Sequence, residues 1–494
     1  MADARESGVL VGDGEAASLN NTIERHMTAQ NKVTLVGHPL IPIGMGEHLR
    51  SVFRALRAVG IPVGVRDVYR TGGDDPDIRR EFDGCLVEEL SPDLNIFCLN
   101  GDEIEPALKC LSDVLPKNAL NIIYPLWELS KYPDVWAHQL NRFDEVWTTS
   151  RFTLESISPV VIKPVMHMPL GVEIKLTSFL GRRYFHIPES AFVFLFAFDF
   201  TSYVQRKNPY AVLRAFEEVC KGRPSEDLCL VIKVKAGKAK EEDYRQFRKY
   251  ISGHTEKVLV IDELLNDNEM KNLLRCCDSF VSLHRSEGFG LGLISAMFLG
   301  KPVVGTGYSG NMDFMSEQNS CIVQYTLCDV PAGAYPFWEG QVWAEPDVTH
   351  AASHMLRLVS EKGYARTIGE IASRHIRVNF SCRATGLRYL DRINSLLAGR
   401  KPISLIAVPA ATGLGTITSL SDARPATRAR EAASAPRGYI RSILQRIKQK
   451  LGSADELLGA RSTALQMFWR LYNYLSAGSR SALVKLYLAL FGRA

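Results

Sequence analysis

The stretch that decides the fold is Ser282–Phe314, SLHRSEGFGLGLISAMFLGKPVVGTGYSGNMDF. An apolar run ending near Leu283 predicts a strand, EGFG predicts a tight turn, and the apolar residues from Leu291 predict a helix. Backbone amides at the start of such a helix suit anionic or sugar oxygens, and Glu287 falls at the strand end, where open α/β sheets bind ligands. A glycine turn with an exposed glutamate is the structural alternative. Strand, turn and helix, followed by GKPVVGT, together favour the ligand site.

A second strand-to-helix junction lies in FDFTSYVQRKNPYAVLRAF, residues 198–216. Pro209 suits the first turn of a helix, so Arg206 and Lys207 come just before a helix start. Cations at that place are electrostatically unfavourable for the helix itself, which favours anion binding over the alternative of a solvated pair. Arginine can clamp a phosphate bidentately and lysine acts as a point charge, so we expect a diphosphate here.

A third junction is GHPLIPIGMGEHLRSVFRALRAVGIPV, residues 37–63. We expect Gly44 and Gly46 to free the chain between a first strand and a helix that runs from about Glu47 to Val59. GMG alone is a weak signal, because many such loops only turn the chain. The sequence has no full dinucleotide fingerprint and no P-loop, so hydride transfer and ATP hydrolysis lack their usual support.

Short apolar runs alternate with helical patterns along the chain, which is typical of parallel sheets covered by helices. The predicted strands are residues 33–36, 94–99, 120–124, 145–149, 192–197, 228–234, 258–261, 279–283 and 302–304. The clearest further helices are 209–221 and 291–298. We therefore predict an α/β protein with two Rossmann-like, doubly wound domains that face a cleft.

The alternation of strand and helix patterns, together with the change in composition after about residue 400, divides the chain into five segments. They are a polar N-terminal extension (1–30), a first Rossmann-like domain (31–180), a second Rossmann-like domain (181–400), a flexible linker (401–436) and a basic amphipathic helical tail (437–494). In the tail, apolar residues from Ile440 to Leu451 fall on one helical face with basic residues around them. This pattern predicts either binding to a membrane surface or a small helical bundle.

Composition narrows the class of protein. The 494 residues are 46% hydrophobic and 23% charged, which allows large cores. No secretory signal or membrane-spanning run is visible, and the ten cysteines lack paired metal-ligand spacing, so we expect a reducing, cytoplasmic setting. The net charge is +5, and residues 401–494 hold 14 Lys plus Arg against 4 Asp plus Glu. The basic excess lies in the tail without a recognised nucleic-acid module, so we expect no nucleic-acid partner.

The motifs together resemble glycosyltransferase family 4, the retaining transferases of the GT-B fold, over roughly residues 32–400. GMGEHLR resembles the family's N-terminal glycine loop, and RKNP resembles its diphosphate-binding segment. EGFGL, followed by AM, GKPVV and SG, resembles the donor-domain signature. YPLWELSKYPDVW and FDEVWTTSRF resemble a bacterial branch that builds surface polysaccharides. The resemblance implies an acceptor domain at 31–180 and a nucleotide-sugar donor domain at 181–400.

The resemblance also implies roles for single residues. Arg206 and Lys207 would hold the donor diphosphate, and Glu287 would contact the donor sugar. The resemblance further implies that the residues around the donor are Gly288, Phe289, Gly290, Leu291, Gly44 and Gly46. Such enzymes resemble one another in needing no bound metal or other cofactor, because side chains and amides neutralise the leaving diphosphate.

Two positions depart from the family pattern. The family usually has a second glutamate eight residues after the first, often on the ribose hydroxyls, and here that position is Ser295. Loss of one charge-assisted hydrogen bond costs about 1.5–3 kcal/mol of binding. The usual arginine upstream of the diphosphate lysine is also missing, with Ser202 near its place. Glu128 and His38, which follow strand ends in the first domain, are weaker candidates for acceptor contacts.

The expected function is transfer of a hexose, mannose-like by our interpretation, from a nucleoside diphosphate sugar to a glycan or lipid-linked acceptor. The product would keep the donor's anomeric configuration and enter a surface polysaccharide such as lipopolysaccharide or exopolysaccharide. We expect the enzyme in the cytoplasm, with its tail peripheral on the inner membrane. Two alternatives remain: a non-catalytic nucleotide- or glycan-binding protein on the same scaffold, and a nucleotide-sugar epimerase that needs no acceptor.

Overall fold

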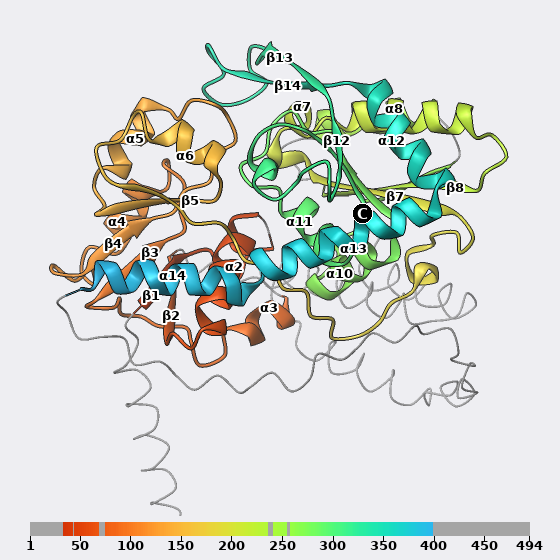
Figure 1. The fold of residues 1–494 in the computed structure, drawn as a ribbon. Helices are drawn as coiled ribbons and strands as arrows, with labels where there is room; N and C mark the ends of the chain where they lie inside the picture. The colour runs from red at the N-terminus through yellow and green to blue at the C-terminus, as the bar shows by residue number, and fades with distance from the viewer. Residues whose placement is uncertain (1–32, 43, 69–74, 236–240, 254–256, 399–494) are drawn as a thin grey trace, which may run out of the picture. The chain divides into compact units, whose positions relative to one another are not determined.

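The computed structural model describes residues 33–42, 44–68, 75–235, 241–253 and 257–398. Within these ranges the chain forms two parallel six-stranded sheets and one two-stranded hairpin (Figure 1). The N-terminal extension, the linker and the basic tail lie outside the described residues, so their structure stays a prediction. No helix in the described part is long and apolar enough to cross a membrane.

The first lobe is built on a sheet of strand order β2-β1-β3-β4-β5-β6. Its strands are β1 (Val33–Gly37), β2 (Val63–Asp67), β3 (Leu94–Phe97), β4 (Leu120–Ile123), β5 (Glu145–Thr148) and β6 (Val165–His167). Its helices are α2 (Gly44–Ala58), α3 (Pro76–Glu81), α4 (Ile104–Cys110), α5 (Asp134–Leu140) and α6 (Arg151–Ile157). β1, β3 and β5 are buried along their whole length, which accounts for the apolar residues that predominate in β1 and β3.

The second lobe repeats this plan with the strand order β12-β11-β10-β7-β8-β9. Its strands are β7 (Phe192–Asp199), β8 (Leu228–Lys235), β9 (Val258–Ile261), β10 (Ser279–Ser282), β11 (Val303–Thr306) and β12 (Cys321–Val323). Its main helices are α7 (Val204–Lys207), α8 (Pro209–Gly222), α9 (Glu241–Ser252), α10 (Asp267–Cys276), α11 (Leu291–Phe298), α12 (Val348–Ser360) and α13 (Lys362–Asn379). The antiparallel hairpin of β13 (Tyr325–Asp329) and β14 (Val342–Pro346) follows β12. The predicted α/β class with two doubly wound domains is confirmed.

The start of α2 differs from the sequence expectation. Gly44 and Gly46 lie in the first turn of the helix, which begins before the predicted Glu47. A Cβ on Gly46 would lie 2.0 Å from the carbonyl oxygen of Ile41, so the preceding turn packs directly on the helix backbone. Arg50 fixes that turn by donating hydrogen bonds to the carbonyls of Pro39 and Ile41, at 2.9 and 3.1 Å.

The last described helix, α14 (Cys382–Leu396), belongs spatially to the first lobe. Its Tyr389 ring stacks on Trp147 with centroids 5.2 Å apart, and Arg392 pairs with the buried Glu145. The predicted second domain, 181–400, includes this helix in sequence, whereas α14 packs against α2. The chain therefore crosses between the lobes twice.

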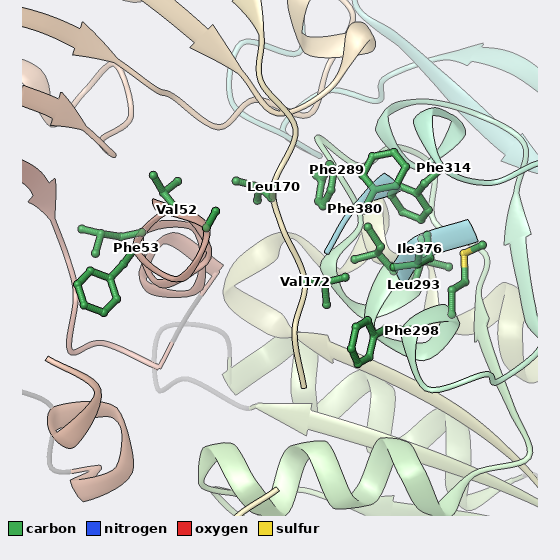
Figure 2. Packing of buried hydrophobic residues seen from close by; sticks show 14 of the residues in the cluster. Val52, Phe53, Leu170, Val172, Phe289, Leu293, Phe298, Phe314, Ile376 and Phe380 are labelled. Atoms are coloured by element: carbon green, nitrogen blue, oxygen red, sulfur yellow. The ribbon is translucent and has the colours of Figure 1, made fainter. Parts of the chain in front are cut away.

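A shared apolar cluster accompanies the first crossing. Figure 2 shows Leu170 and Val172 on the connecting segment, with Val52 of α2 on one side and Phe289 and Leu293 of the second lobe on the other. All five side chains are buried. Burial of apolar surface in one continuous cluster stabilises the contact between the lobes.

Candidate active site

A cavity of about 390 Å³ lies at the carboxyl ends of β7 and β8. Both lobes line it: Gly44 comes from α2, and Leu291 and Ser295 come from α11. These three were expected at the donor site. The position agrees with the rule that open α/β sheets bind ligands beyond the carboxyl ends of their strands.

The start of α11 supplies one wall of this cavity. Gly290 precedes the helix with a φ of 100°, a backbone conformation that glycine adopts without steric cost, and no side chain caps the helix there. The first amides of a helix lack partners within the helix and carry a partial positive charge. Leu291 and Gly292 belong to that first turn and line the cavity. This wall therefore suits an anionic group.

The short helix α7 brings Arg206 and Lys207 to the same loop region. Asn208 ends α7 in a left-handed conformation, with a φ of 54°, and Pro209 opens α8 immediately afterwards. The backbone amide of Arg285 donates to the carbonyl of Arg206 at 2.8 Å, which joins α7 to the loop between β10 and α11. The two strand-to-helix junctions predicted from sequence are thus adjacent in space.

Glu287 is the centre of a buried charge network. Lys207 Nζ donates to its Oε1, and Arg206 Nη1 lies 3.3 Å from its Oε2. Arg206 also donates to the carbonyl of Ser286 at 2.8 Å, and its Nη2 lies 3.9 Å from Oε1 of Glu128. Arg206 is only 3% exposed. Both cations that were expected on a diphosphate therefore contact Glu287 in this structure.

These neighbours decide the charge of Glu287. Burial alone would raise the pKa of its carboxyl, but Lys207 and then Arg206 outweigh burial and lower the pKa to about 2. Burial lowers the pKa of Lys207, and Glu287 offsets part of that effect. Glu287 is consequently an ionised carboxylate at neutral pH, and it accepts hydrogen bonds rather than donating them.

The EGFG turn is held against the first lobe by three hydroxyl groups. Thr149, Ser150 and Thr153 lie 3.3, 2.6 and 3.3 Å from the carbonyl oxygen of Gly288. A Cβ on Gly288 would come within 2.6 Å of the carbonyl oxygen of Trp127. Gly288 thus permits close contact between the lobes, and Phe289 beside it is buried against the second lobe's core.

The two weaker acceptor candidates lie in different surroundings. Glu128 joins the Glu287 network through Arg206, and it accepts a hydrogen bond from Tyr335. His38 instead pairs with Glu103, with 2.6 Å between Nε2 and Oε1. Neither residue is among the described residues that line the cavity, and neither are Arg206, Lys207 and Glu287, whose loop leads into α11. The structure brings Glu128, but not His38, into contact with the predicted donor residues.

Comparison with known proteins agrees with this geometry. Residues 191–330 match the family model described as Glycosyl transferases group 1. The matched segment runs from β7 to β13 and carries Arg206, Lys207 and Glu287. A comparison with curated protein sequences gives no match.

Solved structures share the fold of the glycosyl transferases group 1 segment and of the lobe before it. Anabaena HepE, solved with UDP and glucose, is 13% identical with a TM-score of 0.57, over 74% of this chain and 100% of that one. A glycosyltransferase from Rickettsia africae is 15% identical with a TM-score of 0.54, and sucrose-phosphate synthase from Thermosynechococcus elongatus is 15% identical with a TM-score of 0.53. Each covers 74% of this chain and 99% of its own. The two lobes therefore have the GT-B architecture.

Sequence reasoning missed several residues around the group 1 segment. Tyr335 and Gln341, between the hairpin strands, reach the first lobe: Gln341 Oε1 accepts from the amide of Lys131 at 3.0 Å. No local pattern indicates such a contact. Lys233 and Lys235, at the end of β8, line the cavity, and the signal that could have found them is two alternating lysines that end an apolar strand.

Proposed function

We propose that the protein is a retaining glycosyltransferase of family 4 that transfers a hexose from a nucleoside diphosphate sugar. The observation that carries this proposal is the ionised Glu287, held by Lys207 and Arg206 in the loop before α11, whose first turn lines a cavity between the lobes. The group 1 match and a similar structure that contains UDP and glucose support it. The carboxylate would accept hydrogen bonds from donor sugar hydroxyls.

The proposed chemistry needs charge stabilisation more than covalent catalysis. As the bond from the sugar to the diphosphate breaks, negative charge grows on the leaving oxygen, and fixed amides and cations stabilise that charge. The acceptor hydroxyl attacks from the face that the diphosphate leaves, so the product keeps the anomeric configuration. The leaving diphosphate takes the acceptor's proton. Metal independence and the retaining course are parts of this proposal.

The biological setting is proposed from the sequence resemblance. We place the reaction in the cytoplasm, in bacterial surface polysaccharide synthesis, with a mannose-like hexose and a glycan or lipid-linked acceptor. The basic tail, 437–494, would bind the inner membrane surface. If so, removal of residues 402–494 should abolish co-sedimentation with anionic lipid vesicles, and unchanged sedimentation would exclude this role for the tail.

Ser295 favours one alternative, a protein that binds nucleotides without catalysis. Ser295 lines the cavity where the family usually has a second glutamate, so it offers a hydroxyl but no charge to a ribose. An epimerase is the other alternative. It would use the same donor without an acceptor.

A transfer assay separates these functions. The full chain is incubated with UDP-, GDP-, dTDP- and ADP-sugars labelled in the sugar, together with lipid-linked and oligosaccharide acceptors. We expect one donor to pass its label to an acceptor, with the anomeric configuration retained by NMR. Nucleotide binding without any transfer would favour the non-catalytic alternative, and conversion of the donor sugar without an acceptor would favour the epimerase.

A further inference from the structure

Among the described residues that line the cavity, one cation forms no close ion pair with a carboxylate. Lys233 Nζ donates to the carbonyl of Val234 at 2.6 Å, and no ion pair involves Lys233 among the described residues. The other charged residues that line the cavity have partners. These pairs are Arg50 with Glu47, Lys271 with Asp267, Lys235 with Asp199, and Glu173 with Lys175.

The position of Lys233 is unusual for a lysine. Side chains alternate along a strand, so Cys229, Val231 and Lys233 share one face of β8. Cys229 and Val231 belong to the buried apolar cluster, and Lys233 continues their row while remaining only 7% exposed. Burial lowers the pKa of the Lys233 ammonium. The carboxylates of Asp262, Asp199 and Glu263 offset part of that effect, but none forms a close ion pair with Lys233. Burying an ammonium outside a close ion pair is costly, and an anionic ligand would reduce that cost.

The surrounding walls indicate which anion fits. Lys233 and Lys235 line the cavity on the β8 side, and Leu291 and Gly292 in the first turn of α11 line it as well. Lys235 Nζ also lies 3.5 Å from the carbonyl of Pro42, close to the start of α2. Amides at a helix start together with lysines are the groups that proteins use for phosphates.

Arg206 does not supply the positive charge that a phosphate group in the cavity would need. Its guanidinium contacts Glu287, Glu128 and the carbonyl of Ser286, and it is not among the residues that line the cavity. We propose that Lys233 binds the diphosphate of the nucleotide-sugar donor, opposite the first turn of α11. This inference rests on the proposed function. Arg206 is then a positioning residue for Glu287.

Equilibrium titration with nucleotides tests this role. The probe is the tightest binder among UDP, GDP, dTDP and ADP, compared with its own nucleoside. Lys233→Met should weaken diphosphate binding about tenfold or more and leave nucleoside binding within about twofold, because one charge-assisted contact is lost. Lys249→Met, an exposed lysine of α9, is the matched control and should change neither. The unliganded Lys233→Met variant should melt at the same or a higher temperature, since a buried charge is removed.

A measurement on the unchanged chain makes the test independent of folding of the variant. Acetylation of Lys233 by acetic anhydride, followed by mass spectrometry, should slow when the nucleoside diphosphate is present and should not slow with the nucleoside. Full diphosphate affinity in Lys233→Met, or acetylation unaffected by the diphosphate, would overturn the role of Lys233 alone. Absence of binding by all four nucleotides to the unchanged chain would overturn the proposed function, and this inference with it.

Discussion

Glu287→Gln should lower glycosyl transfer by at least about 100-fold, because a preorganised charged contact to the reacting sugar is replaced by a neutral amide. The same change leaves Arg206 and Lys207 without their shared carboxylate. Loss of one partner from a buried pair costs about 3 kcal/mol or more of the free energy of unfolding. Turnover with the donor that the unchanged chain uses, and denaturant unfolding, measure the two effects.

A second variant separates the two effects of Glu287→Gln. Adding Lys207→Met removes one of the two cations that lose Glu287, so the double variant should recover part of the lost stability without recovering turnover. Glu105→Gln, at an exposed pair with Arg142, is the matched control and should change neither quantity by much. Normal turnover in a folded Glu287→Gln variant would exclude the role given to Glu287.

Gly310→Ala should reduce both stability and turnover, although residue 310 has no functional side chain. A Cβ at this position would lie 2.1 Å from the carbonyl oxygen of Gly288 and 2.8 Å from the amide nitrogen of Phe289. Both are backbone atoms of the EGFG turn, so the turn has to move. We expect a loss of about 1–3 kcal/mol in the free energy of unfolding and about 100-fold in turnover, since a shift near 1 Å misplaces Glu287.

The control for Gly310→Ala is a glycine with open space around it. Gly363 in α13 has no atom within 4 Å of the position a Cβ would take. Gly363→Ala should therefore leave turnover unchanged and raise the free energy of unfolding by about 0.5 kcal/mol, because it restricts the unfolded chain. Equal turnover of Gly310→Ala and Gly363→Ala would contradict the importance of the turn.

Helices and strands whose bounds depend on their own local sequence could be predicted from the amino-acid sequence. Helix α11 has the predicted bounds, Leu291–Phe298, because a glycine turn precedes it and GKP follows it. The five-residue strands β2, β13 and β14 were missed. The three-residue strands β6 and β12 were missed as well, since such short runs lack a clear period. The placement of α14 on the first lobe depends on tertiary contacts such as Tyr389 with Trp147, which no local pattern encodes.

The residues of the candidate site could be predicted from the sequence in part, and their contacts with one another could not. The family resemblance implied that Arg206, Lys207 and Glu287 act on one donor, and the three side chains are in contact. Their pairing with each other was not foreseen, because side-chain direction does not follow from sequence position. Tyr335 reaches Glu128 from the hairpin region, a contact between residues more than two hundred positions apart.

Equilibrium titration of the purified chain with UDP, GDP, dTDP and ADP tests the central claim most directly, namely that the cavity between the lobes binds an activated-sugar nucleotide. We predict that one nucleoside diphosphate binds clearly more tightly than the other three, and that its sugar conjugate competes for the same site. Absence of binding by all four nucleotides and their common sugar conjugates would contradict the account.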